Sequence, residues 1–201
     1  MRYIPQYLER PAQQQLVEDL CKAVEMAPFF TPVMPRTGKP FSVRMTNMGV
    51  LGWVSDKAGY RYQANHPDTK KPWAPIPESV LAIWNKVSDY AHPPEACLVN
   101  YYVGAARMSL HQDRDEDELA APVVSISLGD TALFRIGGTT RGGKTQSIKL
   151  ASGDVFVMEG SSRLAFHGID RVMTGTSTLL KSGGRINLTL RRVTRPKPSP
   201  E

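Results

Sequence analysis

The sequence predicts an α+β protein that is mainly β, in which two amphipathic helices precede about eight short strands. Apolar residues recur at helical spacing twice before Pro94, and short β-type runs separated by glycine-rich turns follow it. Strands at this rhythm are typical of a double-sheet jelly roll or a barrel. At 201 residues, the chain has the size of one domain with its own core.

The two helices are expected over residues 13–27 and 77–90. In the first, Leu16, Leu20 and Val24 recur every four residues among charged side chains. In the second, Pro77 suits the first helical turn, and apolar residues again share one face. We expect both helices to place these faces against a sheet.

The strands are expected where β-type residues run between turn signals such as Gly-Gly and Gly-Asp. Eight runs meet this description: Ala96–Tyr102, Arg107–Asp113, Val123–Leu128, Ala132–Ile136, Gln146–Leu150, Asp154–Met158, Leu164–Ile169 and Arg185–Arg192. Residues 193–201 are rich in proline and basic residues, so we expect a disordered basic tail there.

Composition favours a cytoplasmic protein with a polyanionic partner. The net charge is +6, and no apolar run is long enough to cross a bilayer. The first residues lack the apolar segment of a signal peptide. Cys21 and Cys97 are too few for a disulfide framework, so we interpret both as core residues in a reducing compartment. A monomer without membrane contact is the simplest expectation.

A candidate metal site is formed by His111, Asp113 and His167. Residues i and i+2 of a strand point to the same face, so the first two can bind one ion. A His-x-Asp pair alone is weak support, but a second histidine follows in the right order. Two imidazoles and one carboxylate are typical of the Fe(II) site of non-haem oxygenases, which leaves positions open for O₂ and a cosubstrate.

Two arginines after the triad suggest a dicarboxylate cosubstrate such as 2-oxoglutarate. Arg185 and Arg191 fall on one face of an alternating strand, together with Asn187 and Thr189. A guanidinium matches a carboxylate in shape and charge. An ordinary half-buried strand with its polar side in water would show the same alternation.

Residues 41–73 combine aromatics with cations, with Trp53 and Tyr60 among them. Aromatics between cations can stack bases and hold phosphates. Composition alone favours the simpler interpretation, a hairpin with aromatic cross-strand pairs.

Several motifs closely resemble those of the AlkB family of Fe(II)/2-oxoglutarate dioxygenases: Asn100-Tyr101-Tyr102, Leu110-His111-Gln112-Asp113-Arg114-Asp115-Glu116, Ser125-Ile126-Ser127-Leu128-Gly129, His167-Gly168 and Arg185-Ile186-Asn187-Leu188-Thr189-Leu190-Arg191. The resemblance implies a single domain over residues 1–192 with a double-stranded β-helix (jelly roll). Its catalytic core would span about 95–192, and a nucleotide-recognition lid about 40–75.

The resemblance also implies roles for the iron and cosubstrate residues. The triad of His111, Asp113 and His167 would bind Fe(II). Arg191 would clamp the distal carboxylate of 2-oxoglutarate, and Arg185 would pair with the carboxylate that chelates iron. The side chains that would hydrogen-bond the cosubstrate are Asn100, Tyr102 and Asn187.

On the substrate side, the resemblance implies contacts with a damaged base. Trp53 and His111 would sandwich the base, and Tyr60 would hold a backbone phosphate. Asp115, placed with the iron ligands among the catalytic residues, would hydrogen-bond the exocyclic amine. Met45 would line the lid, and Arg141 would reach toward substrate.

The implied function is oxidative demethylation of N-alkylated bases, of the 1-methyladenine and 3-methylcytosine class, in single-stranded DNA, with RNA as a second candidate substrate. The alkyl carbon would be hydroxylated at the iron and released as an aldehyde, while 2-oxoglutarate and O₂ give succinate and CO₂. Two alternatives stay open. One is an Fe(II)/2-oxoglutarate hydroxylase acting on a protein, lipid or small molecule, and the other is a non-enzymatic nucleic-acid-binding jelly roll.

Overall fold

The computed structural model describes residues 1–197, and this part of the chain forms two α-helices and twelve strands. The helices are α1 (Arg10–Met26) and α2 (Glu78–Val87). The strands are β1 (Arg2–Ile4), β2 (Arg44–Gly49), β3 (Gly52–Asp56), β4 (Gly59–Gln63), β5 (Ala96–Tyr102), β6 (Met108–His111), β7 (Val123–Gly129), β8 (Thr131–Ile136), β9 (Gln146–Leu150), β10 (Val155–Met158), β11 (His167–Met173) and β12 (Arg185–Arg191).

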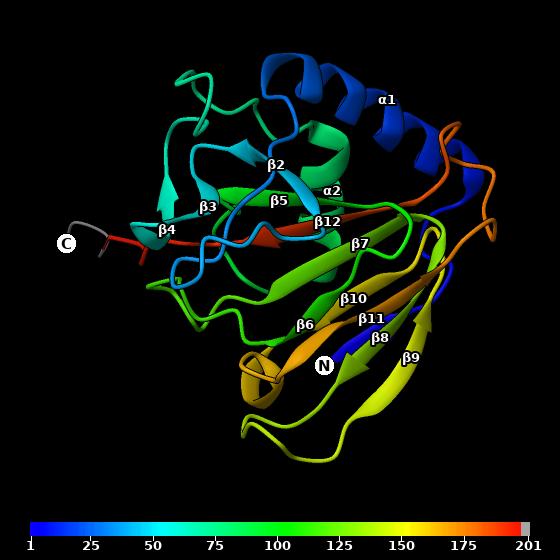
Figure 1. Ribbon diagram of the computed structural model, residues 1–201. Helices are drawn as coiled ribbons and strands as arrows, with labels where there is room; N and C mark the ends of the chain where they lie inside the picture. Colours follow the sequence, from blue (N-terminus) through cyan, green and yellow to red (C-terminus); the bar gives the residue numbers. More distant parts are fainter. Residues whose placement is uncertain (198–201) are drawn as a thin grey trace.

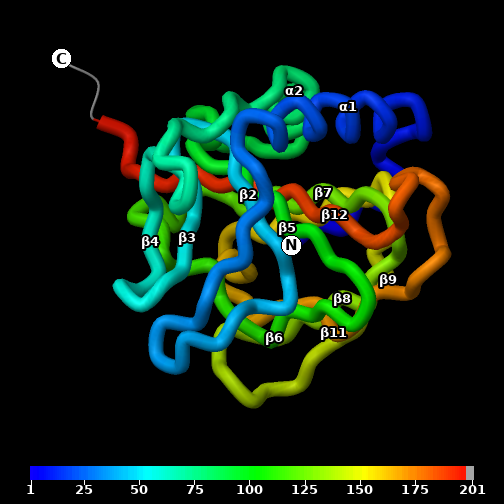
Figure 2. The backbone as a smooth tube through the Cα atoms, turned by 45° about the horizontal axis from the view of Figure 1, so that its top comes forward, coloured from blue at the N-terminus to red at the C-terminus, as the bar shows by residue number. Residues whose placement is uncertain are grey.

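Two antiparallel sheets form the body of the molecule. The larger has the strand order β1-β10-β7-β12-β5-β2, and the smaller has the order β6-β11-β8-β9. In Figure 1 the larger sheet lies between the helices and the smaller sheet. The turned view of Figure 2 again shows the helices on one side and β6, β8 and β11 on the other. Two facing antiparallel sheets are the architecture of a jelly roll, so the predicted fold is confirmed.

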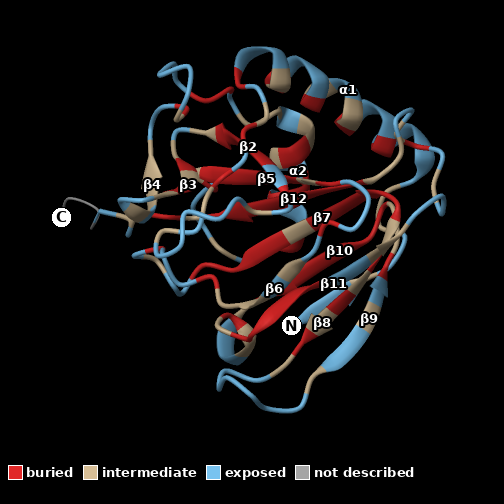
Figure 3. Cartoon of the chain, viewed as in Figure 1, coloured by how far each residue is buried: buried red, intermediate tan, exposed pale blue. Residues whose placement is uncertain are grey.

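The central strands of the larger sheet are buried on both faces, because helices cover one face and the smaller sheet covers the other (Figure 3). Leu188 and Leu190 of β12 pack toward the helices with Leu20 of α1 and Trp84 of α2. A second core lies between the sheets, where the rings of Phe134 and Phe156 are 5.0 Å apart. The predicted role of both helices as supports of a sheet is therefore confirmed.

The predicted helices are present with different ends. Helix α1 begins three residues earlier than expected, because Pro11 fits the first turn, where no backbone N–H is needed. Helix α2 ends at Val87 rather than near residue 90. There Ser88 turns to an extended conformation, and its hydroxyl accepts a hydrogen bond from the backbone N–H of Tyr90.

Strands β5 and β9 have the predicted bounds, whereas two strands that carry site residues do not. Strand β6 ends at His111, two residues before the predicted end, so Asp113 lies beyond it. Strand β11 begins at His167 rather than residue 164 and continues to Met173. In both strands the bound next to the histidine differs from the prediction. There the chain leaves the sheet and turns, which brings the metal ligands together.

Strands β1 to β4 were not among the eight predicted strands. Strand β2 pairs with β5 in the larger sheet, with Met45 opposite Asn100. The first part of the predicted lid is therefore sheet, and only the β3–β4 hairpin stands apart from it. Four consecutive residues of β2 are buried, so its sequence shows none of the alternation that marks a half-buried strand.

The first residues of the predicted tail make hydrogen bonds with the rest of the domain. The backbone N–H groups of Val193 and Thr194 donate to Glu95 Oε2, and Arg195 donates to the backbone oxygen of Asp117. The side chain of Glu95 thus binds the backbone of Val193 and Thr194, and Arg195 contacts a different segment. Residues 198–201 of the predicted tail lie outside the described residues.

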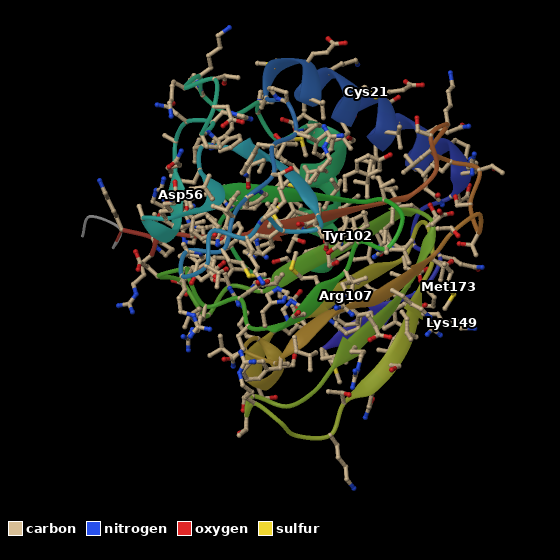
Figure 4. All side chains as sticks on the ribbon, viewed as in Figure 1. Cys21, Asp56, Tyr102, Arg107, Lys149 and Met173 are labelled. Carbon is tan, nitrogen blue, oxygen red and sulfur yellow. The ribbon has the colours of Figure 1, made fainter. Side chains whose placement is uncertain are left out.

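The two cysteines have different surroundings. Cys97 is a core residue as predicted, whereas Cys21 is exposed on the outer side of α1, as Figure 4 shows. The core prediction for Cys21 is wrong because position 21 falls outside the buried face of the helix, which is formed by Gln13, Leu16, Leu20 and Ala23. Neither helix in the described part of the chain is long and apolar enough to cross a membrane.

Candidate active site

The three predicted metal ligands meet at one end of the smaller sheet. Antiparallel pairing of β6 with β11 places His111 opposite His167, and their rings are 4.5 Å apart. Asp113 follows β6 and turns back toward both rings. One ligand atom from each residue lies within 4.8 Å of the others. The predicted cluster is present, although strand periodicity explains only the placement of His111.

Both histidines are oriented by a backbone carbonyl. His111 Nδ1 lies 2.9 Å from the oxygen of Ser109, and His167 Nδ1 lies 2.9 Å from that of Ala165. A carbonyl accepts hydrogen bonds, so Nδ1 carries the proton and Nε2 is left with a free lone pair. The two Nε2 atoms lie 3.7 and 3.8 Å from the carboxylate of Asp113.

The protonation states suit metal binding. Burial lowers the pKa of His167 to about 4, so its imidazole is neutral at pH 7. Burial would raise the pKa of Asp113, but the charge of Arg191 and its hydrogen bonds to the carboxylate outweigh burial and lower it. Two imidazoles and a carboxylate are the donor set of a non-haem Fe(II) site, so the residues fit the implied metal.

The polar face of β12 points into the space between the sheets. Arg185, Asn187, Thr189 and Arg191 are all buried there, so the alternative of a water-exposed face is wrong. Ile186, Leu188 and Leu190 face the helices instead. Pairing with β5 sets Asn187 opposite Asn100 and Arg185 opposite Tyr102, which lies at the centre of the view in Figure 4.

The two arginines have unequal surroundings. Arg191 donates to Asp113 from Nε at 3.1 Å and from Nη2 at 2.8 Å. Burial disfavours its charge, yet Asp113 and other neighbouring acidic groups raise its pKa. Arg185 lies at the far end of β12 and donates to Ser127 Oγ at 2.8 Å and to the oxygen of Leu150. Burial lowers the pKa of Arg185 to about 10, so its charge remains at pH 7.

The two arginines differ in whether they contact a predicted metal ligand. Arg191 touches a metal ligand, so it is placed for the carboxylate that chelates iron. Arg185 begins a seven-residue strand that ends at Arg191, and it is placed for the distal carboxylate. Strand spacing puts both arginines on one face of the sheet without showing which end of the strand meets the metal.

Three unpaired polar atoms support a cosubstrate at this place. In the described residues, the buried side-chain atoms without a hydrogen-bond partner are Trp84 Nε1, Asn100 Oδ1, Arg185 Nε and Arg191 Nη1. The last three belong to residues that line one cavity of about 760 Å³ between the sheets. Buried polar groups need partners. A dicarboxylate can supply acceptors to both arginines, so the residues fit 2-oxoglutarate as well as the metal.

The aromatic segment forms a hairpin whose side chains also line the cavity. Trp53 of β3 stacks on Tyr60 of β4, with the ring centroids 5.6 Å apart and the planes 18° from parallel. The indole Nε1 of Trp53 donates to Asp115 Oδ2 at 2.9 Å. The hairpin interpretation is therefore confirmed, and it does not exclude a binding surface. Phe41, which packs edge-on against Trp53, extends this surface.

The two remaining predicted contacts also border the cavity. Met45 is buried on β2, so it belongs to the wall formed by the larger sheet rather than to the separate hairpin. Arg141 is exposed in the loop between β8 and β9, with its guanidinium 4.9 Å from the ring centre of Phe166. All the side chains predicted for metal, cosubstrate and base thus face one cavity.

The sequence did not predict that Glu116, Tyr62 and Arg163 contribute to this site. These side chains form a buried network behind Asp113 and Arg191. Glu116 and Arg163 are 47 residues apart, so no spacing rule joins them. The available sequence signals are Glu116, which ends the motif at residues 110–116, and Arg163, a charged residue close to the apolar run Leu164-Ala165-Phe166.

Comparisons with known proteins agree with this geometry. The family model of the 2OG-Fe(II) oxygenase superfamily matches residues 1–191. An alpha-ketoglutarate-dependent dioxygenase AlkB homolog of Caulobacter vibrioides is 53% identical over 94% of this chain and 85% of that protein. AlkB of Escherichia coli is 41% identical over 90% of this chain and 85% of that protein. A solved structure of OsALKBH1 is similar, with a TM-score of 0.78 and 30% identity over 94% of this chain and 95% of that one.

Proposed function

Because the chain belongs to the 2OG-Fe(II) oxygenase superfamily and, within it, to the AlkB family, we propose that it is an oxidative demethylase of N-alkylated nucleobases. Its substrates would be bases of the 1-methyladenine and 3-methylcytosine class in single-stranded DNA, with RNA as a second candidate. We further propose that it acts as a monomer. The observation that carries the proposal is the placement of Trp53 and Asp115 on the same cavity as the metal triad.

The chain supplies a metal site and a clamp for the cosubstrate. His111, Asp113 and His167 would hold Fe(II). Arg191 would hold the carboxylate of 2-oxoglutarate nearest the metal, and Arg185 the distal one. When bound, Fe(II) with 2-oxoglutarate and O₂ supplies the oxidising power to hydroxylate an alkyl carbon.

The substrate end of the cavity suits a flat cationic base. Methylation at N1 of adenine or N3 of cytosine removes Watson–Crick pairing, so such a base is extruded at lower cost than a normal one. It also leaves the base positively charged. The face of Trp53 and the carboxylate of Asp115 both favour a cation. Since Asp115 already accepts from Trp53, the aromatic ring and the carboxylate are held together as one recognition surface.

A turnover assay tests the activity. The protein is incubated with Fe(II), ascorbate, 2-oxoglutarate and a single-stranded oligonucleotide that carries one 3-methylcytosine, in DNA and RNA forms. We expect formaldehyde and restored cytosine from the wild type and neither from Asp113→Ala. Unchanged turnover in Asp113→Ala, or none in the wild type, would overturn the proposal.

Trp53→Ala separates nucleobase repair from oxidation of another substrate class. Removing the indole is expected to weaken oligonucleotide binding by about tenfold or more, because stacking on an aromatic ring contributes about 1–3 kcal/mol per base. Phe29, an aromatic residue that packs with Tyr101 on the helix side of the sheet, provides a matched control. If Trp53→Ala binds and turns over the oligonucleotide as the wild type does, a protein or small-molecule substrate becomes the better explanation.

A further inference from the structure

A buried carboxylate connects the aromatic hairpin with the metal and cosubstrate end of the cavity. The side chain of Glu116 is 2% exposed. Its Oε1 accepts a hydrogen bond from the hydroxyl of Tyr62 on β4 and lies 3.3 Å from Arg191 Nε. Its Oε2 accepts from Arg163 Nη2 at 3.1 Å. One side chain therefore holds groups from three separate parts of the chain.

Arg163 extends this network to the metal ligand. Its side chain is 3% exposed and makes three kinds of contact. Besides Glu116, Nη1 donates to the backbone oxygen of Asp113, and Nε donates to that of Ala121 at 2.9 Å. The backbone that carries Asp113 is thus tied to Glu116 through one guanidinium. A buried carboxylate that loses a partner is left with uncompensated charge, so these contacts constrain one another.

The network also fixes the direction of Arg191. Its Nε faces Glu116 and Asp113, and its Nη2 is used by Asp113. This leaves Nη1 as the unpaired donor, which is the group available for a carboxylate. A planar guanidinium held on two sides presents its third side in one orientation, so a ligand need not order it.

Tyr62 supplies the connection to the hairpin. It lies opposite Trp53 in the β3–β4 pair. Burial raises its pKa well above the usual value, so the phenol keeps its proton and donates to Glu116. Trp53 forms the aromatic surface at the substrate end of the cavity. The strand beside it, β4, is hydrogen-bonded through Tyr62 to Glu116, the carboxylate that orients Arg191.

We infer that Glu116 is a positioning residue that couples occupancy of the β3–β4 hairpin by nucleic acid to the affinity for 2-oxoglutarate, through Tyr62 and Arg191. This inference rests on the proposed function. An oligonucleotide bound to the hairpin favours the arrangement seen in the structure, in which Tyr62 contacts Glu116 and Glu116 contacts Arg191. This arrangement keeps Arg191 in the orientation that the cosubstrate needs. By linkage, 2-oxoglutarate strengthens oligonucleotide binding by the same factor.

The test measures binding of 2-oxoglutarate by calorimetry without turnover, using protein loaded with Mn(II) and kept free of O₂. The dissociation constant is determined with and without a saturating oligonucleotide that carries 3-methylcytosine. For the wild type we expect about fivefold tighter binding with the oligonucleotide, at the low end of typical coupling factors. In Tyr62→Phe and in Glu116→Gln the two constants should become equal.

Tyr101→Phe is the matched control, because it removes a hydroxyl that donates to a backbone oxygen on the other face of β5. It should keep the wild-type coupling factor. Tyr62→Phe deletes a single oxygen and keeps the charge network, so it remains informative if Glu116→Gln does not fold. Equal constants in the wild type, or coupling that survives Tyr62→Phe, would overturn the inference. Absence of any 2-oxoglutarate binding by the wild type would instead overturn the proposed function.

Discussion

Arg191 and Asp113 share a two-point contact in which Nε and Nη2 of the arginine donate to the same carboxylate oxygen, at 3.1 and 2.8 Å. The same carboxylate faces both histidines of the metal cluster. Arg191 therefore balances the charge of a metal ligand and also presents an unpaired donor to the cavity. The metal site and the near end of the cosubstrate site are parts of one charge network.

Because Arg185 and Arg191 have different surroundings, replacing each should change metal and 2-oxoglutarate binding differently. Arg185→Met should weaken 2-oxoglutarate binding by about tenfold or more and leave Mn(II) affinity unchanged, because Arg185 touches no metal ligand. Arg191→Met should weaken both, since Asp113 loses its partner. Hydrogen bonds to charged groups contribute about 1.5–3 kcal/mol, which sets this scale. Titration calorimetry of Mn(II), then of 2-oxoglutarate, checks both variants. Identical profiles for the two would contradict the assignment of near and distal ends.

The buried imidazole of His167 predicts how the stability of the metal-free protein depends on pH. Burial lowers its pKa from 6.5 to about 4. Between these values the unfolded chain binds a proton that the folded protein does not, so stability falls as the pH is lowered through this window. The loss should be on the order of 3 kcal/mol and complete near pH 4. Above pH 6.5 the titration of His167 should not change the free energy of unfolding.

Urea unfolding at pH 7.5, 5.5 and 4.5 in the presence of a chelator measures this dependence. His167→Gln is the comparison, because it keeps a polar side chain that does not titrate. The difference between the two proteins isolates the histidine from the carboxylates. Parallel stability curves for the wild type and His167→Gln would show that His167 titrates normally.

Asp115 predicts a preference for charged bases. Asp115→Asn keeps the size of the side chain and an acceptor for the Trp53 N–H but removes the negative charge. We expect kcat/KM for cationic 3-methylcytosine to fall about tenfold, since loss of one charge-assisted contact has roughly this effect. For neutral 3-methylthymine the value should change much less. Equal losses on the two bases, measured by product analysis, would contradict an electrostatic role.

Gly168 predicts that the metal site depends on close approach of two strands. A Cβ at this position would lie 2.5 Å from the backbone oxygen of Met108 and 2.9 Å from the backbone carbon of Ser109. Gly168→Ala should therefore push β6 away from β11 and separate His111 from His167. We expect a loss of about 1–3 kcal/mol in stability and clearly weaker Mn(II) binding.

Gly138→Ala provides the control for this prediction, because a Cβ there has no neighbour within 4 Å. It should bind Mn(II) as the wild type does. Thermal unfolding with and without Mn(II) reports both effects for the two variants. A Gly168→Ala protein with wild-type metal affinity would show that the strands can separate without moving the ligands.

The features that the sequence predicted well are those with a simple periodicity. Alternation along β12 separated Arg185 and Arg191 from Leu188 and Leu190, and the structure places these two sets on opposite faces. Helical spacing identified the apolar faces of α1 and α2. In each case one element alone carries the information, so no knowledge of its neighbours was needed.

The features that were missed depend on contacts between distant segments. Strand β2 is covered on both faces, so Met45 and its neighbours show no alternation. Which arginine lies next to the metal site depends on the position of Asp113 after β6 ends. The role of Glu116 depends on its contacts with Tyr62, Arg163 and Arg191. Such relationships come from the packing of the two sheets, which local sequence does not encode.

The most direct test of the central claim is the stoichiometry of a single reaction. A single-stranded oligonucleotide with one 3-methylcytosine is treated with the Fe(II)-loaded protein, 2-oxoglutarate and O₂, and succinate, formaldehyde and the oligonucleotide mass are measured together. The account predicts one succinate and one formaldehyde for each oligonucleotide that loses a methylene group. Succinate formation at the same rate with an unmodified oligonucleotide, and no loss of mass from the methylated one, would contradict it.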